Sequence, residues 1–270
     1  MSKRPPLLTV GTAIVAITAL AALVGPFIAP FDPSAQDLPA RLAGPTLAHP
    51  FGLDELGRDI LARVLAGAQI SFLVGVTVVS ISAVVGTMLG AVAGYFGGAW
   101  DDVISRVIDT LLAFPGLLLA IALVAVLGPS LLNVLIALTI IGWVGYARLV
   151  RGQVLRAREF EYVAASRALG AGPLHILRKH VIPAAIPAVV VQATLGMAGA
   201  IIGEASLSFL GLGVQPPTPS WGTMLNGGRA HILDAPHLTI FPGLAIAILV
   251  LGFNFIGDGL RDATDPKRVG

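Results

Sequence analysis

Long apolar stretches alternate with shorter polar segments along the whole chain. A hydrocarbon core about 30 Å thick requires about 20 apolar residues as helix. Six stretches meet or approach this length, and they occupy residues 7–29, 70–96, 103–127, 131–147, 185–203 and 238–260. Only the stretch at 131–147 is short. The pattern therefore predicts an all-α, polytopic membrane protein with about six transmembrane helices.

The ends of these stretches carry further signals. Lys3 and Arg4 precede the first stretch, as in a signal peptide, but its uncharged run is longer than the apolar region of about 7–15 residues usual in such peptides. We therefore expect an uncleaved span. Pro115, inside the third stretch, should kink its helix. Gly128-Pro129-Ser130 predicts a tight turn that makes the third and fourth spans an antiparallel pair.

Composition supports a membrane protein. Apolar residues make up 56% of the 270 residues, whereas charged residues make up only 12%. Because a soluble domain carries roughly a quarter charged residues, the bilayer must be the solvent for much of this surface. The chain has no cysteine, which excludes a disulfide scaffold, a thiolate metal site and a cysteine nucleophile.

The basic residues predict the orientation of the spans. With the N-terminus inside, the cytoplasmic segments hold most of the 17 basic residues, namely Lys3, Arg4, Arg106, Arg148, Arg151, Arg156, Arg158, Arg167, Arg178, Lys179, Arg261, Lys267 and Arg268. The segments outside then hold Arg41, Arg58, Arg63 and Arg229. Since Lys and Arg are enriched in cytoplasmic loops, we expect both termini in the cytoplasm.

This topology divides the chain into two units. Residues 1–69 form an N-terminal span followed by a proline-rich extracytoplasmic segment, and residues 70–270 form a core of five spans. The core contains one long cytoplasmic loop at about 148–184, and a second proline-rich external segment follows the fifth span.

Small residues recur on two of the spans. The second span carries glycines at intervals of four, which places them on one helix face and allows another backbone to approach closely: Gly86, Gly90, Gly94 and Gly98. That face packs either within this chain or against another subunit. The fifth span has a similar smooth face formed by Gly196, Gly199 and Gly203.

Polar groups within spans are candidates for function because burying them without a partner is costly. Asp109 and Asp258 lie near the cytoplasmic ends, where pairing with Arg106 and Arg261 would explain them without a role in transport. Glu204 has no basic neighbour in sequence and lies near the outer end of the fifth span, as a group at the mouth of a pathway would. The other candidate lining groups could equally form interhelical hydrogen bonds: Gln69, Asn133, Gln192 and Asn254.

The loop at 148–184 is too long for a simple connector. Residues 156–169 are compatible with a helix, and Gly170-Ala171-Gly172 then interrupts it. Pro173 is well placed to begin a second short helix that must stop near Pro183. Two short amphipathic helices at a membrane surface either lie on anionic lipid or enter a groove on a cytoplasmic protein.

The order of residues in this loop resembles the EAA loop of ABC importer permeases, which runs Glu-Ala-Ala, three residues, Gly, nine residues, Ile, one residue, Leu-Pro. Gly170 and Pro183 stand at matching positions, whereas Ala164 replaces Glu, Ser166 the second Ala, His180 Ile and Ile182 Leu. The resemblance implies a contact with ATPase domains through Ala164, Ala165, Ser166, Gly170, Gly172, Pro173, Leu174, Ile176, Ile182 and Pro183.

Four other segments resemble motifs of dipeptide and oligopeptide permeases. They are residues 49–59, 106–115, 207–222 and 257–266. With the loop, they make residues 10 to 268 similar to the "C" permease subunit of the dipeptide/oligopeptide/nickel importer family. This resemblance implies a type I ABC importer permease fold in the bacterial plasma membrane.

The resemblance also implies the assembly. Its partners would be a homologous "B" permease subunit, two cytoplasmic ATPase domains that bind ATP and Mg, an extracytoplasmic solute-binding protein and membrane lipid, but no nucleic acid. This chain would form half of a pathway that works by alternating access and would have no enzymatic activity of its own. The implied cargo is a dipeptide or oligopeptide, with nickel chelates, glutathione and haem-like ligands as alternatives.

The residues themselves weigh against other classes. A P-loop needs Gly-x-x-x-x-Gly-Lys-Ser/Thr, and no lysine stands in that context, so no cofactor is expected on this chain and energy must arrive through a partner. A stand-alone secondary transporter would need midspan acidic groups or an inverted repeat. An intramembrane enzyme or a metal site would need a constellation within the spans, yet all five histidines fall in loops: His49, His175, His180, His231 and His237.

Overall fold

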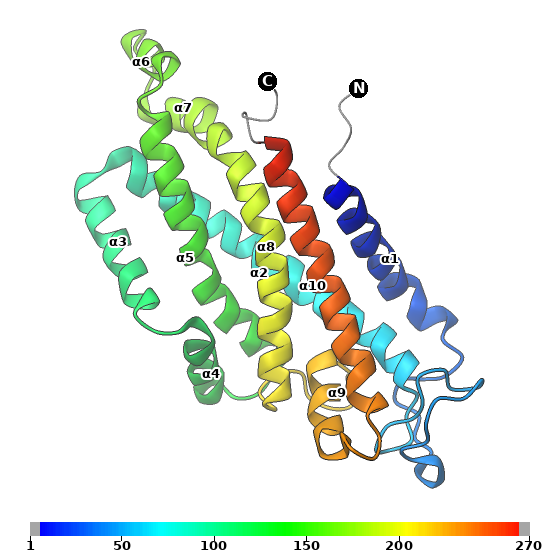
Figure 1. Cartoon of the computed structure of the whole chain (residues 1–270). Helices are drawn as coiled ribbons and strands as arrows, with labels where there is room; N and C mark the ends of the chain where they lie inside the picture. The colour runs from blue at the N-terminus through cyan, green and yellow to red at the C-terminus, as the bar shows by residue number, and fades with distance from the viewer. Residues whose placement is uncertain (1–5, 265–270) are drawn as a thin grey trace.

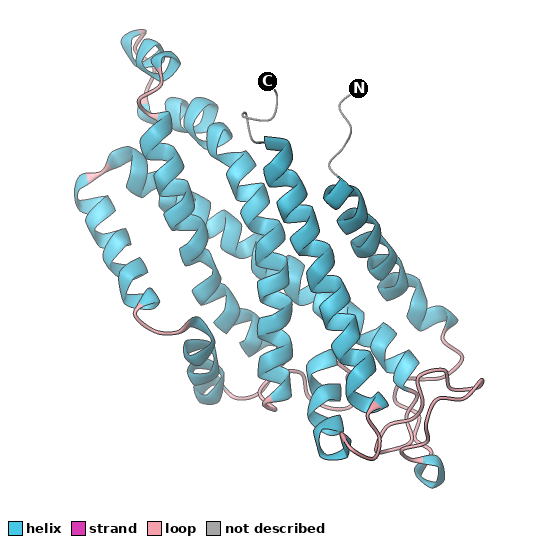
Figure 2. Ribbon diagram, in the orientation of Figure 1, coloured by secondary structure: helices cyan, strands magenta, loops and turns pink. Residues whose placement is uncertain are grey.

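The computed structural model describes residues 6–264. Over this range the chain is helical apart from its loops and one isolated β-bridge between Leu53 and Asp59 (Figure 2). The α-helices are α1 (Pro6–Ile28), α2 (Ile60–Phe96), α3 (Gly98–Leu112), α4 (Gly116–Leu127), α5 (Leu131–Ala157), α6 (Glu161–Ala168), α7 (Pro173–Ile176), α8 (Ile182–Phe209), α9 (Trp221–Gly228) and α10 (His237–Thr264). Single turns η1 (Leu38–Ala40) and η3 (Arg229–His231) are 3-10 helix, and η2 (Leu177–Val181) is π-helix.

The long helices form one bundle with two distinct ends. In Figure 1, α5, α8, α10 and α1 lie roughly side by side, and α2 crosses behind them. Helix α2 packs most extensively on α5, and α1 on α10. The start of α1, the end of α10 and the projecting α6 share one end, whereas α9 and the segment between α1 and α2 lie at the other (Figure 1).

The predicted all-α membrane architecture is confirmed. Among the described residues, five helices are long and apolar enough to cross a membrane, and α3 with α4 can form a sixth, bent span. Side chains such as Val74, Val150 and Ile201 are fully buried where α2, α5 and α8 meet. Large apolar side chains on the outer faces of α1 and α4, for example Ile17 and Val126, remain exposed, as expected for groups that lie in lipid.

The predicted kink at Pro115 is in fact a full break. Helix α3 ends at Leu112, α4 begins at Gly116, and their axes differ by 86°. Proline lacks an N–H group and disfavours helical backbone at the preceding residue, here Phe114. The third predicted span is therefore two separate helices, and α4 packs against α5 after the turn at residues 128–130.

Two helices extend well beyond their predicted ends. Helix α2 begins at Ile60 because the Asp59 side chain accepts a hydrogen bond from the Ala62 N–H at 2.7 Å and caps it. The predicted boundary at residues 69 and 70 thus falls inside α2. Helix α5 continues to Ala157, so the first ten residues of the predicted loop are helical. Hydropathy underestimates both helices because their terminal turns carry arginines.

The expected stop near Pro183 is wrong. Helices α7, η2 and α8 join into one continuous helix over Pro173–Phe209. A proline inside a helix removes a hydrogen bond and clashes with the carbonyl four residues earlier. The wider π-helical turn at Leu177–Val181 lies directly before Pro183, where a wider turn gives the proline ring room.

Candidate functional site

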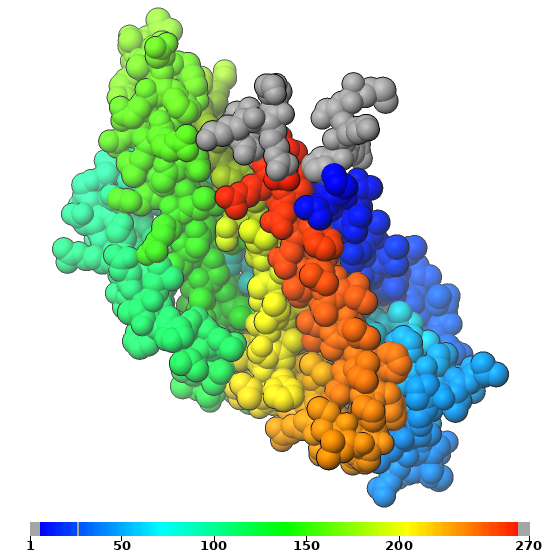
Figure 3. Space-filling model, viewed as in Figure 1, coloured from blue at the N-terminus to red at the C-terminus, as the bar shows by residue number. Residues whose placement is uncertain are grey.

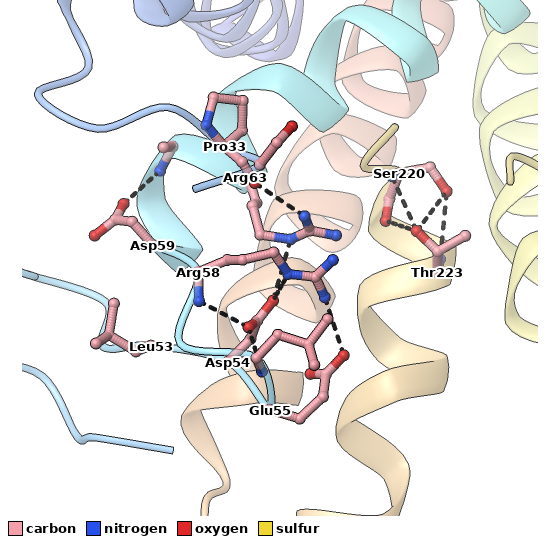
Figure 4. A network of polar contacts seen from close by, with 12 residues as sticks. Pro33, Leu53, Asp54, Glu55, Arg58, Asp59, Arg63, Ser220 and Thr223 are labelled. Atoms are coloured by element: carbon pink, nitrogen blue, oxygen red, sulfur yellow. Dashed lines mark hydrogen bonds and ion pairs between the residues drawn. The ribbon is translucent and has the colours of Figure 1, made fainter. Parts of the chain in front are cut away.

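Residues 49–63 fold into a buried ionic network at the end of the bundle that carries α9 (Figure 4). Arg58 donates from Nε to Asp54 Oδ2 at 2.7 Å and from an Nη atom to Glu55 Oε1 at 3.0 Å. Arg63 places Nε 3.4 Å from the same Asp54 oxygen. Asp54 Oδ1 also accepts from the backbone N–H groups of Leu56 and Arg58. Two buried guanidinium groups therefore share the Asp54 carboxylate, and Glu55 supplies a second negative charge to Arg58.

This network, which we call the Asp54 network (Asp54, Glu55, Arg58 and Arg63), connects distant parts of the chain. Arg63 donates to the carbonyl oxygen of Pro33 at 3.0 Å, which holds the segment after α1. The Glu55 carboxylate packs against Gly227 of α9. The network thus fixes the start of α2 between the segment after α1 and α9.

A second set of contacts anchors the segment between α8 and α9. The Trp221 side chain is 1% exposed, and its indole N–H donates to the Val64 carbonyl oxygen at 2.9 Å. Ser220 and Thr223 form a capping box that starts α9. Residues 207–222, which resemble a permease motif, therefore hold α8, α9 and α2 together.

Glu204 is fully buried and does not line the cavity described below. Its Oε1 atom accepts a hydrogen bond from Ser208 Oγ at 2.6 Å, and Ser208 Oγ accepts one from the Val214 N–H at 3.2 Å. The carboxyl group therefore holds the segment after α8 onto the end of that helix.

The other polar candidates have separate positions. Asn133 donates to the carbonyl oxygens of Leu127 and Gly128 and closes the turn between α4 and α5. Gln69 donates to the Ala22 carbonyl oxygen and ties α2 to α1. Asn254 is half-buried on α10. Gln192 lines the cavity described next.

That cavity has a volume of about 370 Å³ and lies among α2, α4, α5 and α8. Its wall is almost entirely apolar, and three glycines of α8, Gly196, Gly199 and Gly203, form part of it. Of these three, Gly199 borders open space, whereas a side chain on Gly196 or Gly203 would meet Tyr146 or Leu138 of α5. No sequence signal indicated this cavity, because its wall comes from four separate helices.

The glycines of α2 pack within the chain. A side chain on Gly86 or Gly90 would overlap the backbone of α5 at Trp143 or Ala147, and one on Gly94 would meet Arg151. Gly98 is an exception, because α2 ends at Phe96 and both Gly97 and Gly98 have positive φ angles, of 65° and 54°. The prediction that all four glycines share one helix face is wrong for Gly98, since residues with positive φ do not continue a right-handed helix.

Arginines of α5 form ion pairs with α3. Arg151 makes two hydrogen bonds with the Asp101 carboxylate, at 2.5 and 2.7 Å. Arg148 pairs with Asp109 at 3.2 Å, so Asp109 has an ionic partner, although it is Arg148 rather than the expected Arg106. These pairs, which span about forty to fifty positions of sequence, could not be found from local spacing.

The segment from Arg158 to Ile176 projects from the opposite end (Figure 3). Helix α6 occupies residues 161–168, within the predicted helix, and Gly170 ends it with a φ angle of 85°. Of the ten predicted coupling residues, Ile176 is buried, Ser166 and Ile182 are half-buried, and the others are exposed: Ala164, Ala165, Gly170, Gly172, Pro173, Leu174 and Pro183. The structure thus groups most of these residues on one accessible projection.

Some basic residues used to predict orientation, namely Lys3, Arg4, Lys267 and Arg268, lie outside the described residues, as does the end of the 257–266 motif. No group of three or more His, Cys, Asp or Glu side chains able to hold a metal ion occurs in residues 6–264.

Together, the bundle of spanning helices, the cavity within it and the projecting segment define a polytopic membrane permease. Residues 86–270 match the family of binding-protein-dependent transport system inner membrane components, and residues 3–45 match the N-terminal transmembrane domain of oligopeptide transport permease C. The chain belongs to this family and is a C-type permease subunit of an ABC importer, which confirms the resemblance found in the sequence.

Curated relatives cover nearly the whole chain. The glutathione transport system permease protein GsiD of Escherichia coli O6:K15:H31 (strain 536 / UPEC) is 48% identical over 269 residues, which are 99% of this chain and 89% of GsiD. The GsiD protein of Shigella boydii serotype 4 (strain Sb227) gives the same values. The probable D,D-dipeptide transport system permease protein DdpC of Escherichia coli (strain K12) is 43% identical over 270 residues, 100% of this chain and 91% of DdpC.

A solved structure shares the fold. A chain from inward-facing conformations of the MetNI methionine ABC transporter aligns with a TM-score of 0.61 and 20% identity, and the alignment covers 75% of this chain and 97% of that one. The similarity supports the expected ABC importer permease fold.

Proposed function

We propose that this chain is the permease subunit of an ATP-driven importer for small peptides, and that it forms half of the pathway by alternating access. The cargo is proposed from the relatives, since one is named for glutathione, itself a short peptide, and another for D,D-dipeptides. Peptides therefore take precedence over the nickel and haem-like cargoes of the wider family.

The projecting segment carries this proposal. Leu169, which lies between α6 and α7, is 89% exposed, and Leu174, in the first turn of the continuous helix that begins at Pro173, is 68% exposed. Val163 and Ile176 of the same segment are buried and hold it against the bundle. Exposed apolar side chains on a firmly held projection are typical of a protein-binding surface. We assign this surface to a cytoplasmic ATPase domain.

The connection to the membrane supports coupling. Because α7, η2 and α8 form one continuous helix, a displacement of Leu174 is transmitted along the backbone to Gln192, which lines the cavity. No break in the helix separates Leu174 from the wall of the cavity.

The same assignment fixes the orientation. The end with α6 would face the cytoplasm of a bacterial plasma membrane, together with both termini, because it carries Arg156, Arg158, Arg167, Arg178 and Lys179. The opposite end, held by the Asp54 network, would receive an extracytoplasmic solute-binding protein. A homologous permease subunit would complete the pathway, and two ATPase domains would bind ATP and Mg.

The test compares two exposed leucines at opposite ends. Leu174→Glu places a charge on the proposed docking surface, whereas Leu233→Glu changes a side chain that is 96% exposed near α9. We expect Leu174→Glu to abolish copurification of the ATPase subunits and peptide-stimulated ATP hydrolysis in proteoliposomes, and Leu233→Glu to retain copurification. Equal copurification of both variants would contradict the coupling assignment.

Gly170 gives a second test. Its φ angle of 85° suits glycine, and a side chain there would meet no atom within 4 Å. Gly170→Val therefore strains the turn without a clash. We expect the variant to be inserted normally but to lose transport-coupled ATP hydrolysis. Normal assembly together with normal coupling would contradict a role for this turn.

A further inference from the structure

The cavity among α2, α4, α5 and α8 has the properties of a ligand site. Its volume of about 370 Å³ falls in the range of about 300–1,000 Å³ usual for such sites, which are mostly apolar with a few polar groups. Val78, Leu117 and Ile141 contribute apolar walls from three different helices.

No charged residue lines the cavity. None of the residues that form its wall is Asp, Glu, Lys, Arg or His. A charged group moved there would lose its hydration without gaining a counter-charge, which is costly. The cavity therefore accepts an uncharged group, and the charged ends of a zwitterionic cargo must lie outside it.

A few polar groups do face this space. The Ser82 side chain is 1% exposed, and its hydroxyl has no hydrogen-bond partner among residues 6–264. Gln192 lines the cavity from α8, and the Tyr146 hydroxyl makes only a long hydrogen bond of 3.4 Å to the Gln192 carbonyl oxygen. Because a buried hydroxyl without a partner is unfavourable, the Ser82 hydroxyl points to a ligand that offers it one.

The size of the cavity sets the kind of group it holds. Gly199 has no other atom within 4 Å of the place where its Cβ would lie, so the α8 backbone borders free space there. A dry cavity of about 150 Å³ accommodates benzene. A volume of about 370 Å³ therefore holds one large aliphatic or aromatic side chain together with part of its backbone amide.

We propose that this cavity binds one uncharged, apolar side chain of the peptide cargo, with the Ser82 hydroxyl and the Gln192 amide available to the adjoining peptide group. The proposal rests on the peptide cargo proposed above. A lipid acyl chain would fit the apolar wall, but it has no group for Ser82 or Gln192, so these residues favour peptide.

The absence of native cysteine from the chain permits a direct test. A Gly199→Cys variant is prepared in the purified transporter complex. The rate at which maleimide alkylates residue 199 is then measured by mass spectrometry in the presence of Phe-Phe, Leu-Leu or Gly-Gly dipeptide. At about ten times Kd, occupancy should slow alkylation about tenfold. We expect this for Phe-Phe and Leu-Leu and not for Gly-Gly. Gly243→Cys is the matched control, since Gly243 also has room for a side chain but does not line the cavity; its alkylation should be unaffected.

Uptake of the same dipeptides by the wild-type complex in proteoliposomes separates this inference from the proposed function. Normal uptake, with residue 199 unprotected or protected equally by Gly-Gly, overturns the side-chain site and leaves the peptide importer standing. Protection by added phospholipid alone assigns the cavity to lipid and also overturns the inference. Failure to import any dipeptide overturns the proposed cargo and the inference with it.

Discussion

The Asp54→Asn substitution tests whether the Asp54 network stabilises the end of the permease that carries α9. The asparagine keeps the shape of the side chain and an oxygen that can accept from the Leu56 and Arg58 N–H groups. It replaces Oδ2, which faces Nε of Arg58 at 2.7 Å and Nε of Arg63 at 3.4 Å, with a neutral NH₂ donor. Two guanidinium groups then share only Glu55.

The magnitude follows from burial. The side chains of Asp54, Arg58 and Arg63 are 7%, 10% and 5% exposed. Removing one partner from a buried ion pair lowers the free energy of unfolding by about 3–5 kcal/mol. Because the Glu55 carboxylate remains beside Arg58, we expect the lower end of this range, about 3 kcal/mol. With roughly 2–4 °C per kcal/mol for a chain near this size, Tm should fall by about 6–12 °C.

The assay is thermal unfolding of the purified permease in detergent, followed by tryptophan fluorescence. Trp221 is a suitable probe because it is buried and bonded to α2 close to the network. Asp109→Asn is the matched control, since the Asp109–Arg148 pair is 72% and 60% exposed and such pairs contribute about 0–1 kcal/mol.

Two results would refute the reasoning about the Asp54 network. The first is an Asp54→Asn variant whose Tm lies within about one degree of the Tm of Asp109→Asn. Loss of a buried pair should lower the Tm by several degrees more than that. The second concerns the double variant Asp54→Asn, Arg63→Met, which removes one uncompensated charge and should recover part of the lost stability. A double variant whose loss of stability equals the sum of the two single losses would show that the two charges are not coupled.

Three further substitutions give expected changes in stability by the same assay. Gly90→Leu should cost about 3 kcal/mol, because its side chain would overlap the Ala147 backbone and separate α2 from α5; a wild-type Tm would disprove that contact. Trp221→Phe should cost at least about 1 kcal/mol through loss of the hydrogen bond to the Val64 carbonyl oxygen, and an unchanged Tm would mean that this bond does not stabilise the contact between α9 and α2. Ser82→Ala should leave stability unchanged or raise it by about 1 kcal/mol, because it removes a buried hydroxyl without a partner; a clear loss would reveal a structural partner for Ser82.

The spanning helices could be predicted from the sequence because a lipid-exposed helix must be apolar over a fixed length. The ends of these helices could not. Arg148 and Arg151 suggested a loop, yet both remain helical because carboxylates of α3 neutralise them. Hydropathy records the charge of a side chain but not its partner.

The candidate site was predictable only in part. The Gly170 turn follows from local order, because a helix followed by glycine specifies a left-handed residue without reference to the rest of the fold. The cavity and the Asp54 network depend on contacts between helices. Nothing local indicates that Arg63 meets Asp54, since the turn at Gly57, with a φ angle of 73°, reverses the chain between them.

The continuous helix from Pro173 to Phe209 has a mechanical consequence. Its 37 residues, at 1.5 Å per residue, make a rod about 55 Å long, which exceeds the thickness of the hydrocarbon core by about 25 Å. A tilt of about 5° about one end would swing the other by about 5 Å, roughly one helical turn. The rod contains one irregular turn, the π-helix at Leu177–Val181, which lies between α7 and α8. Under the proposed coupling, a stroke delivered to α7 must pass through this π-helical turn before it reaches the cavity wall at Gln192.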